Sequence, residues 1–140
     1  MFDLDECTAF ITKKASKQLT DSFNNRLIVL GVTRVQWIAL FYLGKYEGLS
    51  QKNLGKLMGV KESSVARLID RLEKNDYVIR EKDINDRRIT NLKLTKEGKK
   101  ARENLIPEGQ KFSEILTKDI TDEQLEIFNY VLKTMVKNVI

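Results

Sequence analysis

The chain has 140 residues, of which 41% are hydrophobic and 32% charged, and its formal net charge is +5. This size suits one compact domain or a small domain with helical arms, and the composition excludes a disordered or fibrous chain. One cysteine excludes an internal disulfide, and the longest apolar run, residues 37–43, is far shorter than the roughly 20 residues that span a bilayer. The N-terminus is acidic, unlike a signal peptide, so we expect a cytoplasmic protein with no membrane partner.

The first predicted helix covers residues 4–30, where apolar side chains recur at helical spacing. Gly31 can take a positive φ and is expected to end it. Thr33 and Gln36 then form a capping box for a second helix. This second helix is apolar around much of its circumference, so we expect it to be the buried helix of the domain.

Two further helices, residues 51–58 and 62–75, are predicted on either side of a turn. Gly59 suits the turn because it tolerates positive φ, and Gly55 has no side chain to obstruct a close crossing of the helices. The spacing therefore indicates a helix-turn-helix, with apolar residues pointing inward at Leu54, Leu57, Val60, Val65, Leu68, Ile69 and Leu72.

The apolar period changes to two after Tyr77, which predicts a β-hairpin with a polar tip at residues 83–86 and a return strand at 89–94. Leu92 and Leu94 are expected on its buried face. Two more helices follow, at residues 96–116 and 122–139, and the last carries a wide apolar stripe. Such a stripe on a small protein needs a partner surface, so we expect a second subunit to cover part of it.

These elements predict a mainly α fold with a small β-hairpin wing (α+β), in the order of a winged helix-turn-helix. We expect residues 32–100 to form the winged helix-turn-helix lobe. Residues 1–31 and 101–140 are expected to form dimerisation helices within one continuous protomer.

The positive charge is concentrated in the predicted lobe. Residues 50–100 contain 14 Lys and Arg against 8 Asp and Glu, whereas the rest of the chain carries a net charge of −1. Most lysine-rich segments are solvated surfaces, but here the excess coincides with a unit that could neutralise nucleic-acid phosphates.

Together, the segments LGVTRVQW at 30–37, SSVARLIDRLEK at 63–74, DINDRR at 83–88 and LKLT at 92–95 resemble the MarR family of bacterial transcriptional regulators. The resemblance covers nearly the whole chain. It implies a homodimeric regulator, expected to be a repressor, on a pseudo-palindromic double-stranded DNA operator. It also implies a recognition helix in the major groove, a wing in the minor groove, and release by a small aromatic or phenolic effector.

Two positions depart from the family pattern. The wing of many members has a cation where Asn85 stands here, so the tip has one positive charge fewer. The recognition helix usually begins after an Asp or Ser cap, whereas Lys61 occupies that place and cannot accept hydrogen bonds from the first amides. Lys61 could instead present a cation and free amides to a phosphate.

The recognition helix supplies most of the DNA-binding candidates. Arg67 can read guanine through O6 and N7, its alternatives being a phosphate contact or an ion pair with Asp70 or Glu73. Ser63 and Ser64 either contact DNA or act as ordinary capping residues. Backbone phosphate contacts are expected from Gln51, Lys61 and Arg71.

At the wing, Arg88 is the candidate for insertion into a narrow minor groove, where negative potential is concentrated. Asp86 could orient its guanidinium through a charge-assisted hydrogen bond, and Arg87 is a further contact candidate. The alternative for both arginines is a solvated hairpin tip.

An effector site is predicted from aromatic residues and one lysine on the first two helices, although aromatic residues at helical spacing are more often core. The candidates are Phe10, Lys14, Trp37, Phe41 and Tyr42. Cys7 invites a redox interpretation, but acidic neighbours disfavour a reactive thiolate, so we expect an ordinary half-buried thiol.

The residue inventory argues against an enzyme, because the chain has no histidine, one cysteine and no glycine-rich phosphate loop. We expect no cofactor, and a metal site would depend on carboxylates alone. The competing function is a winged-helix protein-interaction module. Salt separates the two, since DNA binding weakens steeply as salt rises.

Overall fold

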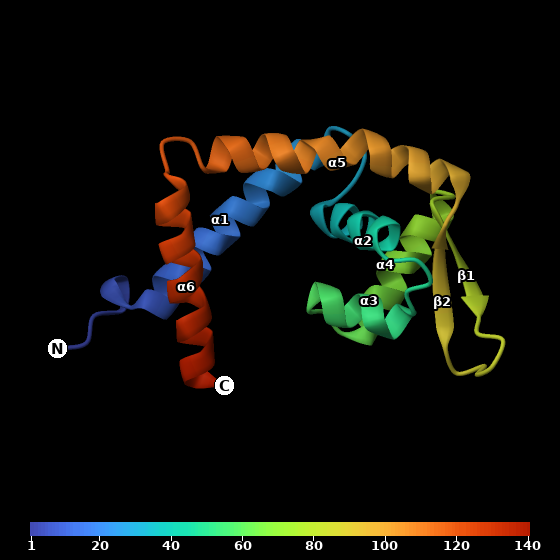
Figure 1. Ribbon diagram of the computed structural model, residues 1–140, viewed down its shortest axis with the longest axis horizontal. Helices are drawn as coiled ribbons and strands as arrows, with labels where there is room; N and C mark the ends of the chain where they lie inside the picture. The colour runs from blue at the N-terminus through green and yellow to red at the C-terminus, as the bar shows by residue number, and fades with distance from the viewer. The chain divides into compact units, whose positions relative to one another are not determined.

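The computed structural model describes residues 1–140 (Figure 1). It confirms the predicted class, six α-helices with one antiparallel two-stranded sheet, preceded by a short 3-10 helix. The elements are η1 (Leu4–Glu6), α1 (Thr8–Ile28), α2 (Arg34–Lys45), α3 (Gln51–Met58), α4 (Glu62–Lys74), β1 (Val78–Lys82), β2 (Thr90–Leu94), α5 (Lys96–Leu116) and α6 (Asp122–Val139).

The first helix differs from the prediction at both ends. Cys7 has extended backbone angles and separates η1 from α1, which ends at Ile28 rather than at Leu30. Gly31 does take a positive φ of 91°, but it lies in the turn beyond the helix end. The second helix begins as predicted, with the full Thr33–Gln36 capping box.

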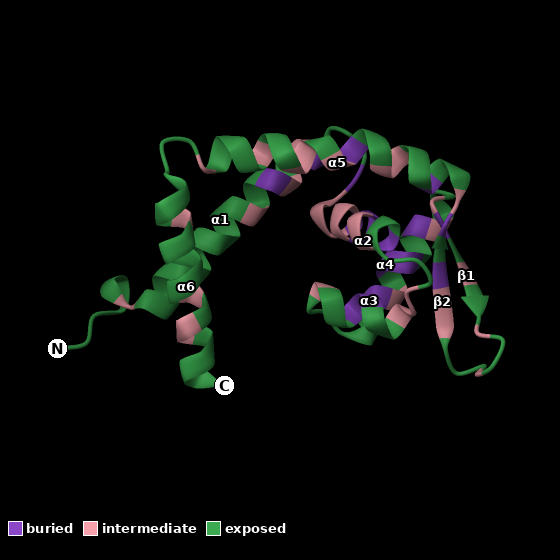
Figure 2. Cartoon of the chain, in the orientation of Figure 1, coloured by how far each residue is buried: buried purple, intermediate pink, exposed green.

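The chain forms two compact units, Met1–Glu108 and Gly109–Ile140. The core of the first unit lies between α2, α3, α4 and the hairpin, where buried residues gather in Figure 2. Its largest fully buried side chains are Leu27, Leu40, Leu54, Val65, Ile69, Leu72 and Val78.

Two of the predicted inward residues are exposed: Leu57 has 40% of its surface accessible and Val60 37%. Val60 follows the left-handed Gly59, so it belongs to the turn and no helix face directs it inward. Leu57 lies in the last turn of the eight-residue α3, at the edge of a surface hollow. The other predicted inward residues of the helix-turn-helix are buried.

The two glycines of the helix-turn-helix act as the sequence predicts. A Cβ on Gly55 would lie 3.1 Å from Val65 Cγ2, so the absence of a side chain permits the close crossing of α3 and α4. Gly59 has a φ of 69° and donates its N–H to the carbonyls at the end of α3. It therefore ends that helix as a left-handed cap.

The hairpin is held against the helices at its base. In its register Val78 pairs with Leu94 and Arg80 with Leu92, and Leu92 N donates to Leu49 O at 2.8 Å. Leu92 and Leu94 are buried as predicted. The second strand begins at Thr90, so Ile89 lies in the turn, where it is exposed.

The first half of α5 is tied to α2 by long-range hydrogen bonds. Trp37 Nε1 donates to Leu105 O at 2.7 Å. The guanidinium of Arg102 donates to Leu40 O at 3.0 Å and to Phe41 O at 3.1 Å. These bonds link residues more than 60 positions apart and fix the lobe to the first half of α5.

In the second unit, α6 begins with the predicted capping box of Thr121 and Gln124. No residue of α6 is buried, as Figure 2 shows. Its exposed large apolar side chains are Ile127, Phe128, Tyr130, Val131, Val136 and Val139. Across the chain, no helix combines the length and apolar character needed to span a membrane.

Candidate nucleic-acid interface

One face of α4 is buried and the opposite face carries the predicted DNA-contacting side chains. Val65, Leu68, Ile69 and Leu72 form the buried face. The four candidates of the recognition helix are all exposed: Ser63, Ser64, Arg67 and Arg71. Because residues four apart share a helix face, Ser63, Arg67 and Arg71 project side by side.

Arg67 has no ion-pair partner. The two carboxylates considered as its partners, Asp70 and Glu73, instead contact Arg80. The structure therefore has no ion pair between Arg67 and either carboxylate, and the Arg67 guanidinium is available for a ligand.

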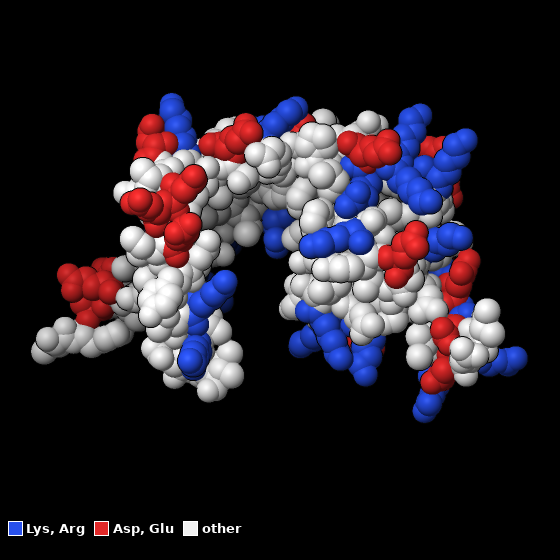
Figure 3. All heavy atoms as spheres, viewed as in Figure 1, with Lys and Arg blue, Asp and Glu red and all other residues white.

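The N-terminal end of α4 is left without a side-chain cap. Lys61 occupies the cap position with extended backbone angles, and no side-chain hydrogen bond satisfies the first amides. The Lys61 side chain is exposed. Figure 3 shows Lys and Arg side chains along the lower edge of the lobe and at the hairpin tip, where Asp and Glu lie among them.

At the hairpin tip, the carboxylate of Asp86 forms a two-point ion pair with the guanidinium of Arg88, as predicted. Arg88 Nε donates to Oδ1 at 3.1 Å and Nη2 donates to Oδ2 at 3.0 Å, while 90% of the Arg88 side chain remains accessible. The pKa of Asp86 lies below its ordinary 3.8 because Arg88 donates to it from its side chain and its backbone. The same pair raises the pKa of Arg88.

A second carboxylate shapes the tip. Asp83 accepts hydrogen bonds from the Asn91 side chain at 2.9 Å and from the backbone of Asn85 at 3.0 Å and Asp86 at 3.1 Å. The pKa of Asp83 is lowered, first by the Asn91 bond and then by the Asn85 amide. Arg87 is exposed and forms no ion pair.

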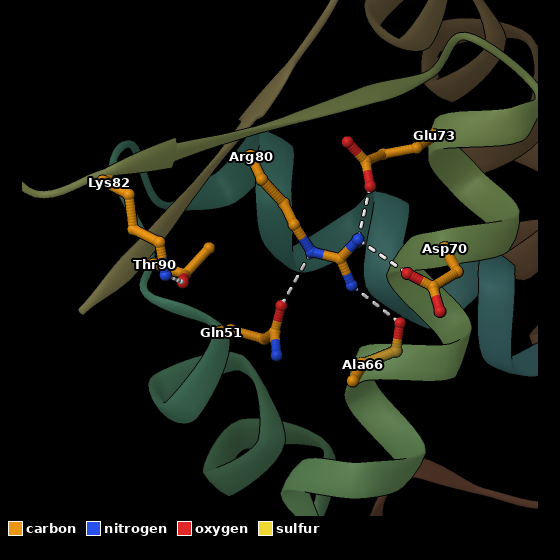
Figure 4. A network of polar contacts seen from close by, with 7 residues as sticks. All are labelled: Gln51, Ala66, Asp70, Glu73, Arg80, Lys82 and Thr90. Atoms are coloured by element: carbon orange, nitrogen blue, oxygen red, sulfur yellow. Dashed lines mark hydrogen bonds and ion pairs between the residues drawn. The ribbon is translucent and has the colours of Figure 1, made fainter. Parts of the chain in front are cut away.

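Sequence reasoning missed Arg80, whose guanidinium is the centre of a polar network that joins β1 to α3 and α4 (Figure 4). One of its partners is Gln51, predicted as a phosphate contact, whose Oε1 accepts from Arg80 Nε at 3.1 Å. A signal was present in the strand pattern. Alternation places Arg80 on the same face as buried Val78, and an inward-facing cation requires partners.

The structure divides the five predicted effector residues between two hollows. Phe10 and Lys14 line a shallow depression on α1. Trp37, Phe41 and Tyr42 line another, of about 330 Å³, together with Leu57 and Met58.

The geometry of α1 explains the division. Phe23 is the α1 residue whose ring meets Trp37, at 5.1 Å between centroids, and Phe10 lies 13 positions earlier. At 1.5 Å per residue this is about 20 Å along the helix. The aromatic residues of α2 are half-buried, so they are neither fully core nor fully exposed.

Cys7 is a free, half-buried cysteine at the cap position of α1, as expected. Nothing adjacent to it forms a group of potential metal ligands, and no such group exists elsewhere in the chain.

Comparisons with known proteins agree with this geometry. The sequence model of the MarR family matches residues 30–89. The uncharacterized HTH-type transcriptional regulator YwoH of Bacillus subtilis is 31% identical over 130 residues, covering 93% of this chain and 88% of YwoH.

Solved structures give the same result. A mutant MarR from E. coli complexed with operator DNA superposes with a TM-score of 0.81 at 25% identity, covering 89% of this chain and 90% of that one. The S. aureus MepR–DNA complex shares the fold, with a TM-score of 0.87 at 22% identity and coverage of 94% and 98%.

Proposed function

Because this chain belongs to the MarR family, we propose that it is a transcriptional regulator that binds double-stranded DNA sequence-specifically, and not an enzyme. We propose further that it acts as a repressor, as a homodimer on a pseudo-palindromic operator. The observation that carries the proposal is the pair of exposed guanidiniums, Arg67 on α4 and Arg88 at the hairpin tip, presented by one folded lobe.

Each proposed contact follows from chemistry and position. Arg67 on the outward face of α4 suits guanine in the major groove, flanked by Ser63 and Ser64. Arg88, held by Asp86 yet 90% accessible, suits insertion into a minor groove, with Arg87 beside it. Lys61 at the uncapped start of α4 and Arg71 farther along suit phosphates. Gln51 keeps its amide nitrogen for a phosphate while its oxygen holds Arg80.

The dimer is proposed from apolar surface that one protomer leaves exposed. Residues 1–31 and 101–140 are its proposed dimerisation helices, and residues 32–100 its DNA-binding lobe. Support comes from α6, where Phe128 and Tyr130 are exposed and no residue is buried. Contiguous apolar surface of this kind marks association sites.

Oligomeric state tests the dimer directly. Sedimentation equilibrium at micromolar concentration is expected to give a mass near twice the 16.2 kDa of one chain. Phe128→Asp places a charge on the exposed apolar face and is expected to raise the dissociation constant, whereas Lys133→Ala, which changes the net charge of the same helix by the same one unit, serves as the matched control. A monomeric wild-type protein would contradict the proposal.

DNA binding is tested by fluorescence anisotropy with the DNA upstream of the chain's own reading frame, titrated at several salt concentrations. We expect steep weakening with salt and half-sites about 10–10.5 bp apart. Arg67→Ala and Arg88→Ala should each cost about 1–3 kcal/mol. Lys17→Ala, which removes one exposed cation paired to Asp21 on α1, is the control and should bind as wild type.

The competing function, a winged-helix protein-interaction module, predicts a different result. Such a module would bind the operator and unrelated DNA equally weakly. Arg67→Ala and Arg88→Ala would then have the same effect on binding to both DNAs. An apolar protein contact would also survive salt that dissociates DNA.

We propose that a small aromatic or phenolic effector relieves DNA binding from the hollow lined by Trp37, Phe41 and Tyr42. Its lining is apolar and includes three half-buried aromatic side chains, which suits a flat apolar ligand. Benzoate and phenol can be titrated against the fluorescence of the single tryptophan. Tyr42→Ala should weaken the response more than Phe10→Ala, and an unaltered response in Tyr42→Ala would place the site elsewhere.

A further inference from the structure

Arg80, on β1, contacts two helices of the lobe, α3 and α4, with one side chain. From β1, its Nε donates to Gln51 Oε1 at the start of α3, at 3.1 Å. Its Nη1 donates to Asp70 Oδ1 at 2.7 Å and to Glu73 on α4, and its Nη2 donates to Ala66 O at 2.8 Å. Figure 4 shows these partners converging on the guanidinium from both helices.

The network uses the geometry of a guanidinium rather than its charge alone. Four of the five N–H groups of arginine are occupied, and they point in fixed directions within one plane. The side chain is only 25% accessible, and two carboxylates accompany it. A lysine ammonium would keep the charge but could not reach both helices in this fork.

The backbone that carries Arg80 is also fixed. Arg80 pairs with Leu92, which is buried and bonded to Leu49 O. Arg80 therefore joins a rigid strand base to the helix that carries Arg67, and Ala66, whose carbonyl it binds, is the residue next to Arg67.

Because the hairpin tip lies beyond Arg80, a small change in the angle between the hairpin and α4 displaces the tip. Six residue steps run from Arg80 to Asp86, but only the first two, to the end of β1 at Lys82, are extended strand, and the chain then turns. At about 3.3 Å per strand residue the tip lies roughly 10 Å beyond Arg80. A tilt of roughly 20° at Arg80 then moves the tip by about 3 Å, which is the length of a hydrogen bond. Arg88 at the tip could not keep its groove contact after such a displacement.

We propose that Arg80 is a positioning residue that sets the angle between the β-hairpin and α4, so that Arg67 and Arg88 reach their two grooves in the same complex. The inference rests on the proposed DNA-binding function. It assigns Arg80 no direct contact with DNA.

A double-mutant cycle on the operator tests this role. In the wild-type background Arg88→Ala is expected to weaken operator binding about tenfold. In the Arg80→Lys background, which preserves net charge, the tip is already displaced, so the same Arg88→Ala change should weaken binding less than about threefold. If Arg80→Lys merely unfolded part of the protein, the fraction able to bind DNA would fall equally with and without Arg88→Ala. The tenfold effect of Arg88→Ala on operator binding would then be unchanged.

Lys82→Ala is the matched control. Lys82 lies two residues farther along the same strand and bonds only to Thr90 across the hairpin. In its background Arg88→Ala should keep its full effect. Glu73→Ala is the second variant. Glu73 is partly exposed on α4, and alanine has a high helix propensity, so we expect the helix to stay folded. Like Arg80→Lys, this variant should make the effect of Arg88→Ala on operator binding smaller.

The outcomes separate the two proposals. A wild-type protein that does not prefer the operator over scrambled DNA overturns the proposed function itself. Operator binding with an undiminished Arg88→Ala factor in both the Arg80→Lys and Glu73→Ala backgrounds overturns the positioning role alone. A factor that shrinks in those two backgrounds but not in Lys82→Ala supports it.

Discussion

Asp86 and Arg88, two residues apart, form a two-point ion pair in which both carboxylate oxygens accept from the guanidinium, at 3.1 and 3.0 Å. Asp86 Oδ1 also accepts from the Arg88 backbone at 2.9 Å. The carboxylate therefore fixes both the backbone and the head group of a side chain that is otherwise free in solvent. Such pairs orient a guanidinium more strictly than a single contact does.

Removing this carboxylate should lower specificity while raising positive charge. In Asp86→Ala we expect operator binding to weaken about three- to tenfold, because Arg88 must be ordered on binding. Binding to scrambled DNA should hold or improve, since the tip gains a net positive charge. Anisotropy on both DNAs gives the ratio, and Glu81→Ala, an exposed acid on β1, is the control for charge. An unchanged ratio would contradict the orienting role.

The pKa values of the two carboxylates at the hairpin tip predict the pH range in which acid weakens the tip. Because the folded pKa of both Asp83 and Asp86 lies below 3.8, their bonds stabilise the tip above that pH. This stabilisation is lost as pH falls through the folded pKa. Carbon-13 NMR titration should find both midpoints below 3.8.

Asn91 is the first cause of the Asp83 shift, so Asn91→Ala should move the pKa of Asp83 upward and leave that of Asp86 in place. An unmoved Asp83 midpoint would show that the backbone amides of Asn85 and Asp86 suffice.

Lys61 should affect stability and DNA binding in opposite directions. Lys61→Ser supplies the missing cap of α4 and should stabilise the fold by about 0.5–1 kcal/mol. It also removes a proposed phosphate contact, which should weaken operator binding and reduce the salt slope by about 1. Urea denaturation and salt-dependent anisotropy measure the two effects. Lys61→Ala should reproduce the loss of binding without the gain in stability.

Gly98 is needed where α5 passes the base of the hairpin. A Cβ at this buried position would overlap the Tyr77 carbonyl, which also accepts from Thr95 N at 3.0 Å. Because backbone cannot move aside as a side chain can, Gly98→Ala should destabilise the fold by about 1–3 kcal/mol in urea denaturation. Lys100→Ala, exposed on the same helix, should be within about 0.5 kcal/mol of wild type.

Gly44 and Arg102 should be non-additive. Arg102 lies across Gly44, where an added Cβ would displace its guanidinium from the carbonyls of Leu40 and Phe41. Gly44→Ala should therefore destabilise wild type. In an Arg102→Ala background the obstruction is gone, and the same change should stabilise by up to about 1 kcal/mol through helix propensity. Two equal effects in the cycle would show that Arg102 does not lie over Gly44 in solution.

Several features of this protein were determined by short stretches of sequence. The capping boxes of Thr33–Gln36 and Thr121–Gln124 depend on groups three residues apart, and the turn at Gly59 depends on one residue's freedom at positive φ. The change of apolar period after Tyr77 likewise located the hairpin, and the pairing of Asp86 with Arg88 spans two residues. Local hydrogen bonding and steric limits act within a few residues, so the features that depend on them can be predicted from the sequence.

Only the tertiary structure decided which distant side chains meet. The Arg80–Gln51 bond joins residues 29 positions apart, and the Arg102–Leu40 bond joins residues 62 apart. The same holds for the separation of Phe10 from Trp37, which follows from the straight length of α1, and for the exposure of Leu57. Such contacts depend on how helices cross and where they end. The sequence identified the proposed DNA-reading side chains, whereas packing assigned Arg80 as the joint between the surfaces that present them.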